Sequence, residues 1–363
     1  MAERGAVPKV SAVRRKTLDA MRSLFTPLLP DDYLELINPL WSTRELRGRV
    51  EEIHRETGSA ATIYIKSGHV WEGHEPGQYL RVGVVVDGIF HWRAYSLTSE
   101  PERADGWISI TPKLVDAGKV SPYLVRQAQP GAILRLGGVE GDFVLPDPLP
   151  DRMLFISAGS GITPIMSMLR SLHRREALED VVHLHSARRE DDVIFGRQLR
   201  ALGERPGFRL HLHVTGERER LKPADLDELC PDWRDRVTFA SGPGELLDAL
   251  AAHWEAHGDP EALRMERFQP KIGGGEEGEG GTIRFAASDT ETEGDGGTPI
   301  LVAGEEAGLE LPFGCREGIC HTCIGKLCSG RVRDLRNGKV YGSEGEMVRT
   351  CISAPEGAIE IDL

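Results

Sequence analysis

The chain lacks a long hydrophobic run. None of its 363 residues lies in a window that approaches the roughly 18 consecutive apolar residues of a membrane-spanning helix. The N-terminus also lacks the succession of basic, apolar and small residues that marks a secretory signal. The cytoplasm is therefore the expected compartment. The composition, 40% hydrophobic and 28% charged, suits a soluble globular protein, and the length of 363 residues suits two or three domains, each with its own core.

Cysteine is scarce, and its distribution is uneven. The chain has six cysteines, and five of them fall in the last 49 residues. A secreted fold held together by disulfides would be short and rich in cysteine throughout. The distribution argues against that class and directs attention to the C-terminal end.

Positive charge is in deficit. The formal net charge of −13 argues against a nucleic-acid-binding protein. Residues 264–363 contain 11 Lys and Arg against 18 Asp and Glu, whereas residues 1–30 contain six against two. The two ends of the chain therefore suit different partners.

Three modules with different hydrophobic periods follow an N-terminal extension at residues 1–46. Short alternating runs with Gly and Pro predict a small antiparallel β-barrel at residues 47–150. Apolar runs that alternate with helical patterns predict an α/β domain with a parallel sheet at residues 151–258. Residues 263–363 read as a third, mostly β module. The expected fold class is multidomain α+β.

The cysteines near the C-terminus have the spacing of an iron–sulfur site. Cys315, Cys320 and Cys323 form C-x4-C-x2-C, and Cys351 follows, which is the plant-type pattern for a 2Fe–2S cluster. Structural zinc, the alternative, usually takes two short Cys or His pairs, and only one is present. Cys328 lies in a strand-like apolar run, and we interpret it as a small core residue.

One strand of the first module carries candidate flavin contacts. In "RAYSLTS", Arg93 and Tyr95 are two residues apart, so both can address one ligand, a cation for phosphate and a ring for stacking. Downstream, in "GKVSPYL", Gly118 and Ser121 lead into a helix whose N–H groups could bind pyrophosphate. Arg and Tyr also alternate on many solvated strands, which is the alternative.

A glycine-rich string joins a strand to a helix in the second module. "SAGSGITP" at residues 157–164 ends in Thr163 as the expected N-cap and Pro164 as the first helical residue. It is not a complete G-x-G-x-x-G, so a turn without a ligand stays an alternative.

Two histidine pairs alternate along predicted strands of the same module. Residues of one face could bind a metal, but neither pair lies near a carboxylate or cysteine motif. We interpret them as sheet or surface residues: His183, His185, His211 and His213.

These strings together resemble the ferredoxin–NADP reductase superfamily. The resemblance rests on Arg93–Ser96, Gly159–Pro164 and Ser241–Pro243, and the terminal cysteines resemble a fused plant-type ferredoxin. The order flavin, nicotinamide, iron–sulfur is similar to that of reductase components of bacterial oxygenases and desaturases. It implies an NAD(P)H-dependent oxidoreductase with an antiparallel flavin-binding β-barrel, an α/β nucleotide-binding domain and a β-grasp ferredoxin domain.

The resemblance also implies roles for individual residues. Arg93 would bind flavin phosphate, Tyr95 would pack beside the isoalloxazine, and Ser96 near N5 and Ser241 near the nicotinamide would be catalytic. The other implied cofactor-binding residues are Gln78, Tyr79, Ala94, Lys113, Gly118, Lys119, Val120, Ser121, Gly159, Gly161 and Thr163. The implied cluster ligands are Cys315, Cys320, Cys323 and Cys351.

Two expectations concern the cofactors. FAD rather than FMN is expected, because Gly118–Ser121 offers a second phosphate-binding element. NADPH is expected as the donor, because Arg188 and Arg189 follow the second strand of the α/β domain and could pair with a 2′-phosphate. The alternative is that Asp191 and Asp192 already bind these arginines as solvated ion pairs.

The electron acceptor is the remaining question. "INPLWSTRELRGRV" at residues 37–50 resembles actinobacterial reductases that supply membrane acyl-CoA desaturases. The basic, partly amphipathic residues 1–30 could rest on the inner face of the membrane or simply pack on the barrel. A soluble ring-hydroxylating or CoA-ester oxygenase is the alternative acceptor. A flavin and iron–sulfur redox sensor without sustained turnover is the alternative of another class.

Overall fold

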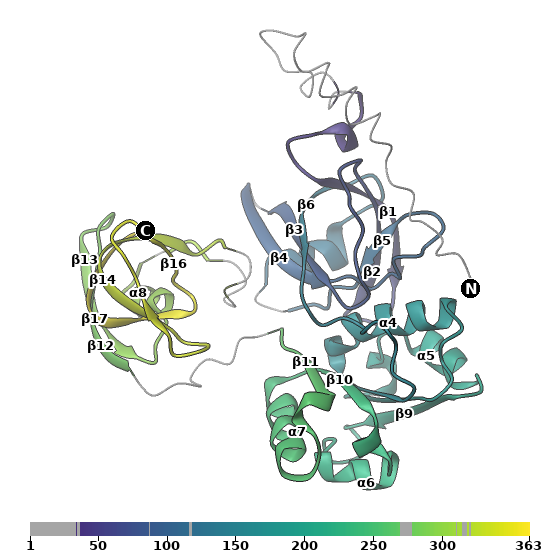
Figure 1. Ribbon diagram of the computed structural model, residues 1–363. Helices are drawn as coiled ribbons and strands as arrows, with labels where there is room; N and C mark the ends of the chain where they lie inside the picture. The colour runs from purple at the N-terminus through teal and green to yellow at the C-terminus, as the bar shows by residue number, and fades with distance from the viewer. Residues whose placement is uncertain are drawn as a thin grey trace. The chain divides into compact units, whose positions relative to one another are not determined.

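The structure is a computed structural model, and its chain divides into two compact units (Figure 1). One unit ends at Arg267 and the other begins at Phe268, except that His91–Ala94 cluster with the second. The described residues are 34, 37–86, 88–115, 118–268, 278–309, 311–313, 318 and 321–363.

The first part of the first unit is an antiparallel, barrel-like sheet, as expected. Its six strands have the order β4-β3-β6-β1-β2-β5. Its core consists of alternate, inward-facing residues such as Val50, Ile63 and Leu80, which are fully buried. The strands are β1 (Arg47–Arg55), β2 (Ala61–Ser67), β3 (Tyr79–Val86), β4 (Ile89–Ser96), β5 (Ile108–Ile110) and β6 (Ile133–Glu140). Helix α3 (Val120–Pro122) and the π-helical turn η2 (Tyr123–Gln127) connect β5 to β6.

The described part of the N-terminal extension packs on this sheet. The 3-10 turn η1 (Pro39–Trp41) buries Leu40, whose carbonyl lies 3.3 Å from Nδ1 of His69. The basic pattern at residues 1–30 lies outside the described residues. Among those that are described, no helix is long and apolar enough to cross a membrane.

The second part of the first unit is a parallel five-stranded sheet of order β11-β10-β7-β8-β9. Its strands are β7 (Met153–Ala158), β8 (Val181–Ala187), β9 (Phe208–Val214), β10 (Val237–Ser241) and β11 (Leu263–Glu266). Its helices are α4 (Ile162–Arg174), α5 (Gly196–Gly203), α6 (Leu226–Leu229) and α7 (Gly244–His257). The 3-10 turns are η3 (Gly159–Gly161), η4 (Glu190–Asp192), η5 (Pro223–Asp225), η6 (Trp233–Asp235) and η7 (Pro260–Ala262).

Strand β11 corrects a domain boundary. Residues 263–266 were expected to open the ferredoxin domain, but they pair in parallel with β10 and complete the α/β sheet. The expected limit at residue 258 is therefore too early, because a four-residue edge strand after a helix carries a weak pattern of its own.

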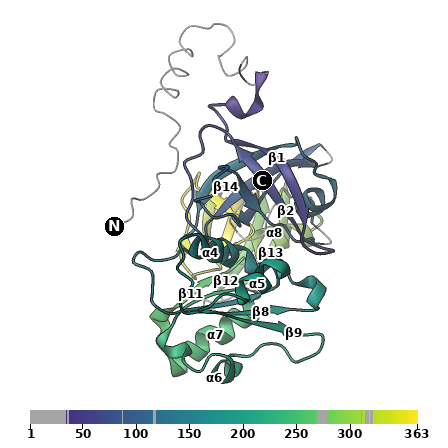
Figure 2. The ribbon, with the colours of Figure 1, turned by 90° about the vertical axis from the view of Figure 1, so that its right-hand side faces the viewer.

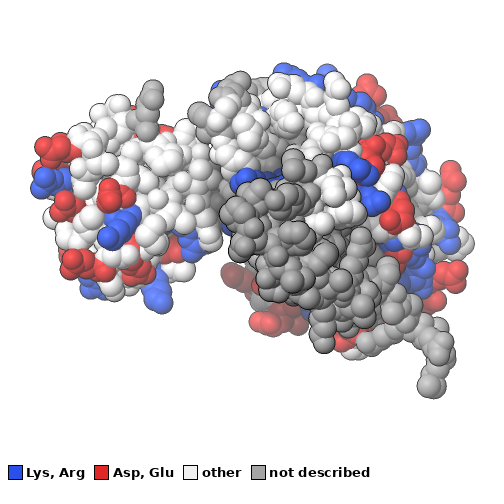
Figure 3. All heavy atoms as spheres, turned by 90° about the horizontal axis from the view of Figure 1, so that it is seen from above, with Lys and Arg blue, Asp and Glu red and all other residues white. Residues whose placement is uncertain are grey.

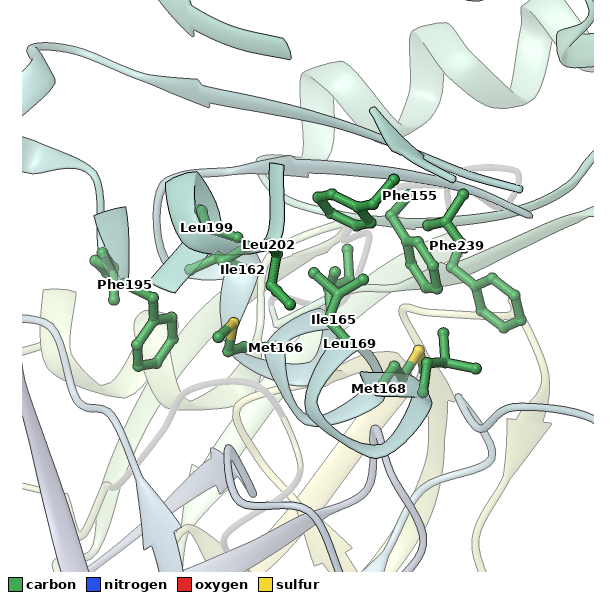
Figure 4. Close-up of a cluster of buried hydrophobic side chains, with 14 of the residues drawn as sticks. Phe155, Ile162, Ile165, Met166, Met168, Leu169, Phe195, Leu199, Leu202 and Phe239 are labelled. Carbon is green, nitrogen blue, oxygen red and sulfur yellow. The ribbon is translucent and has the colours of Figure 1, made fainter. Parts of the chain in front are cut away.

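Both faces of the parallel sheet are covered, which explains its continuous apolar strands. Helices α4 and α5 lie on one face and α6 and α7 on the other (Figure 2). On the α4 face, Phe155 stacks on Phe239 with ring centroids 5.4 Å apart, within the cluster drawn in Figure 4. On the other face, Trp233 and Trp254 pack with Leu154.

The second unit contains a mixed sheet around one helix, the expected ferredoxin domain. Its strands have the order β13-β12-β17-β14-β15, and β16 pairs with β14. Strand β12 runs parallel to β17, and the other pairs are antiparallel. The elements are β12 (Gly278–Phe285), β13 (Thr290–Gly296), α8 (Ile300–Glu306), β14 (Ile324–Asp334), β15 (Val340–Tyr341), β16 (Met347–Arg349) and β17 (Ser353–Asp362).

Cys328 does not belong to the core of this unit. Its neighbour Leu327 on β14 is fully buried, and alternate residues of a strand face opposite sides. Cys328 is therefore half-exposed on the other face, and the core interpretation was wrong. Cys230 in the α/β domain is fully buried.

Arg236 holds the amino-terminal edge of the parallel sheet together. Its side chain is 1% exposed and pairs with Asp180 and Asp232, each at 2.7 Å. It also donates to the carbonyl of Met153 on β7. Hydrogen bonds from Arg236 lower the pKa of Asp232 to about 2. A single buried guanidinium thus connects the starts of β7 and β10 with the loop before β8.

We predict that Arg236→Gln destabilises the α/β domain by about 3 kcal/mol, because removing one partner strands the buried polar groups around it. The matched control is Arg220→Gln, which breaks the exposed pair with Glu245 and should cost less than about 1 kcal/mol. Native-state hydrogen exchange of β7–β10 peptides, read by mass spectrometry, measures both. Equal protection in the two variants would contradict the prediction.

Candidate functional site

The glycine string forms a tight loop at the carboxyl end of β7. Gly159 has φ +55°, a left-handed conformation that favours glycine. A Cβ on Gly161 would stand 2.1 Å from the carbonyl oxygen of Ser241 and 2.7 Å from the N of Gly242. Only glycine fits there, so the loop is packed directly against the end of β10.

Thr163 does not cap helix α4. The helix begins at Ile162, with Gly161 in the N-cap position, so the expected N-cap was wrong by two residues. The hydroxyl of Thr163 donates instead to the carbonyl of Ser160 at 2.9 Å and closes the loop on itself. Pro164 lies in the first turn, where its missing N–H is not needed.

Lys113 reaches this loop from the barrel. It lies in an isolated bridge with Ala60, and its Nζ is 3.8 Å from where a Cβ on Gly159 would stand. The space that glycine leaves open thus faces an ammonium group near the start of a helix. Such an arrangement fits an anion, so these residues suit the phosphates of a nicotinamide nucleotide.

A buried polar cluster lies on β7 and β8 beneath the loop. Oγ of Ser157 is 2.9 Å from Nε2 of His183 and 2.7 Å from Nδ1 of His185, and all three residues are fully buried. Burial lowers the pKa of His183 well below its ordinary range, and burial together with Lys113 lowers that of His185 to about 4. Both imidazoles are therefore neutral, as members of a hydrogen-bonded core.

The other histidine pair lies on the neighbouring strand β9. His211 and His213 are half-buried on β9, and Nε2 of His213 lies 2.6 Å from the carbonyl of Glu219. The described residues contain no group of three or more His, Cys, Asp or Glu that could hold a metal ion.

Strand β4 carries the candidate flavin contacts in alternation. Arg93 and Tyr95 share one face, whereas Ala94 and Ser96 share the other. Nη1 of Arg93 donates to the carbonyl of Trp92 at 2.7 Å, so the guanidinium must turn outward to bind a phosphate. Tyr95 packs against the barrel core, and Ser96 is 6% exposed.

The start of β3, which neighbours β4 in the sheet, lies beside the residue that follows Ser96. The backbone N of Leu97 donates to the carbonyl of Gln78 at 2.8 Å, which places the "GQY" string beside the end of β4. The side chain of Gln78 donates to Gly141. Burial, then the charge of Glu140, raises the pKa of Tyr79 to about 12, so its phenol is a hydrogen-bond donor at neutral pH.

The second candidate phosphate element is a tight turn before α3. The hydroxyl of Ser121 accepts from the N of Val115 at 3.1 Å, and a Cβ on Gly118 would stand 3.0 Å from the Val115 carbonyl. Lys119 precedes the helix, and Val120 is its first residue. These contacts hold Gly118 and Ser121 beside Val115, which fits a phosphate-binding element.

Helix α4 connects the two halves of this unit. Oγ of Ser167 donates to the carbonyl of Ser99, and Nη1 of Arg170 donates to that of Thr98, each at 2.6 Å. The glycine loop and the end of the Ser96 strand are therefore held by one helix. Further contacts of the same kind are Ser171–Glu102, Arg174–Glu100 and Arg175–Glu102.

The sequence analysis missed Glu266. It ends β11 in register with Ser241, and burial, then the charge of Asp142, raises its pKa to about 7. The carboxyl group therefore lies at the same edge of the sheet as Ser241. The string "LRME" at residues 263–266 could have revealed Glu266 as the end of a strand. It was missed because the α/β domain was expected to end at residue 258.

Arg188 and Arg189 follow the carboxyl end of β8, the strand that pairs in parallel with β7. They line an open hollow of about 510 Å³ together with Asp192, Thr215 and Gly216. Nε of Arg189 bonds Asp192 at 3.1 Å, which is one of the two ion pairs weighed as the alternative. Arg188 is exposed and contributes its charge to the hollow.

In the second unit, Cys323 and Cys351 are buried side chains of one core. Backbone N and Oγ1 of Thr350 both donate to the carbonyl of Cys323, at 3.0 and 2.9 Å. The N of Gly318 donates to Sγ of Cys351 at 3.2 Å, a bond that stabilises a thiolate. This donor set suits a 2Fe–2S cluster. Cys315 and Cys320 lie outside the described residues, and His321 is exposed.

Family models match each of the three modules. An oxidoreductase FAD-binding domain matches residues 50–145, an oxidoreductase NAD-binding domain residues 155–226, and a 2Fe-2S iron-sulfur cluster binding domain residues 284–356. The chain is thus an enzyme that uses FAD, NAD(P)H and a 2Fe–2S cluster. FAD was expected, and these matches confirm it.

Several reductases are similar to this chain over most of its length. The chain is 46% identical over 342 residues to the NADPH oxidoreductase of Mycobacterium tuberculosis, covering 93% of this chain and 90% of that protein. It is 31% identical over 319 residues to the glycine betaine monooxygenase reductase subunit of Pseudomonas aeruginosa, covering 79% and 87%. Phthalate dioxygenase reductase has the same fold, with a TM-score of 0.59 at 20% identity over 87% of this chain and 97% of that one.

The fold and site therefore define an NAD(P)H-dependent flavin and iron–sulfur reductase. The chain belongs to the ferredoxin–NADP reductase superfamily, in the three-domain arrangement found in reductase components of oxygenases.

We predict that Gly161→Ala raises the KM for the nicotinamide nucleotide roughly tenfold or more, because the added methyl must displace the backbone at Ser241. The matched control is Gly138→Ala on β6, where a Cβ meets no atom within 4 Å. Steady-state reduction of ferricyanide measures KM, and the flavin spectrum confirms that each variant is loaded. An unchanged KM in a loaded Gly161→Ala protein would contradict the geometry.

Proposed function

We propose that this reductase passes electrons from NADPH to a separate, oxygen-activating partner protein. The main support for this proposal is that one helix, α4, joins the glycine loop, which suits an anion, to the end of the candidate flavin strand β4. Domain limits near residues 46, 150 and 267 are part of the proposal.

The chain's own residues bind and orient the nucleotide. Lys113 and the loop at Gly159–Gly161 would hold the pyrophosphate. The buried hydroxyl of Ser241 has no hydrogen-bond partner in the described part of the structure, so it can bond the nicotinamide end of the donor, opposite Ser96. When bound, the flavin supplies the conversion from hydride to single-electron transfer. The hydrogen bonds from α4 to the carbonyls of Thr98 and Ser99 hold the glycine loop in place relative to the end of β4.

The remaining site assignments follow the same logic. Arg93, Tyr95 and the turn at Gly118–Ser121 would hold the flavin, with Gln78, Tyr79, Ala94, Lys119 and Val120 beside them. Thr163 would shape the glycine loop. Cys315, Cys320, Cys323 and Cys351 would bind the cluster, and Cys328 would not, because it lies on the opposite face of β14 from the core that contains Cys323 and Cys351.

NADPH is the proposed donor, with Arg188 as the main contact to its 2′-phosphate. Arg188 lines the hollow after β8 with Thr215 and Gly216, whereas Arg189 is engaged by Asp192. A guanidinium suits a phosphate because its planar donors match the oxygen geometry. The name of the Mycobacterium tuberculosis relative supports the same donor.

We predict that Arg188→Ala lowers kcat/KM for NADPH about tenfold to a hundredfold, the equivalent of one charge-assisted hydrogen-bond contact. The value for NADH should change little, because NADH has no 2′-phosphate. Arg189→Ala is the matched control and should have a smaller effect. An enzyme that prefers NADH and is unaffected by either change would exclude NADPH as the donor.

Two acceptor classes are candidates. The names of relatives favour an oxygenase: they include a glycine betaine monooxygenase reductase subunit and the ferredoxin reductase component of a 3-ketosteroid-9-alpha-monooxygenase. The resemblance of residues 37–50 favours a membrane acyl-CoA desaturase. The described part of the N-terminal extension packs on the barrel, and this packing favours neither acceptor class. A cytoplasmic location, with peripheral membrane contact in the desaturase case, is part of the proposal.

The deciding experiment offers both acceptors to one preparation. The purified reductase and NADPH are mixed with membranes that contain the desaturase encoded nearest to it, or with a purified soluble oxygenase. Product formation is measured by mass spectrometry. We expect turnover with one acceptor and loss of that turnover in Cys351→Ser.

Two controls separate the possible results. Cys328→Ala keeps the cluster and should keep full turnover. Ferricyanide, which accepts electrons directly from flavin, should still be reduced by Cys351→Ser. Full turnover by a Cys351→Ser protein that lacks the cluster would refute the electron path, and ferricyanide reduction with no product from either acceptor would refute both acceptor classes.

A further inference from the structure

Arg349 contacts Gly318, the residue whose N–H bonds the sulfur of Cys351. It ends strand β16 (Met347–Arg349), two residues before Cys351. Its neighbour Val348 is fully buried in the core, and Arg349 faces the other way because residues alternate along a strand. Nη1 of Arg349 donates to the carbonyl oxygen of Gly318 at 2.8 Å.

Gly318 is held on both sides. Its φ of +73° favours glycine, and a Cβ there would stand 2.4 Å from Cδ1 of Ile352. Its carbonyl accepts from Arg349, while its N–H donates to Sγ of Cys351. Arg349 therefore restrains the residue whose N–H bonds this sulfur.

The guanidinium of Arg349 forms no direct ion pair among the described residues, although the Asp334 carboxylate interacts with it through space. The hydrogen bond of Arg349 goes to a neutral carbonyl, whereas Arg333 forms a bidentate pair with Glu356 at 2.8 and 2.6 Å. Asp334 is bound by Arg336 in the same way. Reduction adds one negative charge to a cluster held by thiolates, so a cation beside it stabilises the reduced form.

We propose that Arg349 is a positioning residue that raises the reduction potential of the cluster. It holds Gly318 against Cys351 and places a positive charge beside the sulfur. A cluster held there would gain one electron on reduction, which makes and breaks no bond. The inference rests on the proposed ligand role of Cys351, and it concerns the potential rather than the identity of the acceptor.

The test compares Arg349→Gln with Arg331→Gln in the full-length reductase. Arg331 is exposed on β14, seven residues beyond the strand partner of Arg349, which is roughly 23 Å along the strand. Both changes remove one positive charge. Dye-mediated redox titration, read by cluster absorbance and by electron paramagnetic resonance, gives the potential of each.

At the midpoint potential of the unchanged protein, Arg349→Gln should show a reduced-to-oxidised ratio about tenfold lower, which is about 59 mV for one electron. Arg331→Gln should leave the ratio unchanged, and Arg349→Lys should restore most of it because the charge is kept. Equal potentials for Arg349→Gln and Arg331→Gln would overturn the inference.

A second pair of variants covers the case in which Arg349→Gln loads no iron. Met347 lies on the same face of β16 and is 59% exposed, so changes there carry little risk to folding. Met347→Lys should raise the potential and Met347→Glu should lower it. No difference between them would overturn the inference. A failure of the ligand assignment would be seen separately, as a cluster retained in Cys351→Ser.

Discussion

The hydrogen bonds from helix α4 to the backbone carbonyls of Thr98 and Ser99 govern the geometry of the first unit. Hydride transfer needs a donor and an acceptor within contact distance, so a small displacement of either half is costly. Ser167 and Arg170 lie on one stripe of the helix and bond successive carbonyls just after Ser96. The same helix begins in the glycine loop. One rigid element therefore relates the nucleotide-binding loop to the barrel.

The loop depends in turn on close backbone contact. A side chain at Gly161 has no room because the end of β10 lies against it, and this contact brings Ser241 to the site. The polar cluster of Ser157, His183 and His185 fills the sheet beneath the loop without charge, since burial keeps both imidazoles neutral. The charge at this edge is supplied by Lys113 from the barrel, where an anionic nucleotide can use it.

The ferredoxin unit solves a different problem, the stabilisation of buried thiolates. Cys323 and Cys351 lie in an apolar core, where an unpaired negative charge would be costly. Backbone N–H groups offset that cost, and Gly318 supplies one of them. On the face shown in Figure 3, basic and acidic side chains of the described residues are interspersed.

The sequence by itself determined the three modules, the cofactor classes and most candidate residues. These are carried by local patterns: strand alternation, glycine strings and the spacing of Cys315, Cys320, Cys323 and Cys351. Local signals were weaker at element ends. The start of α4 was placed two residues late, and the face of Cys328 was misjudged, because an apolar run does not show which of its residues points inward.

Only the tertiary structure decided which distant residues meet. Lys113 reaches Gly159, Glu266 aligns with Ser241, and Arg349 bonds Gly318. Each contact joins segments far apart in the chain, and each depends on strand register and helix packing. The packing energies that set this register are spread over the whole core, so no short stretch of sequence predicts these contacts. The classes of cofactor could therefore be predicted from the sequence, whereas the long-range contacts around their sites could not.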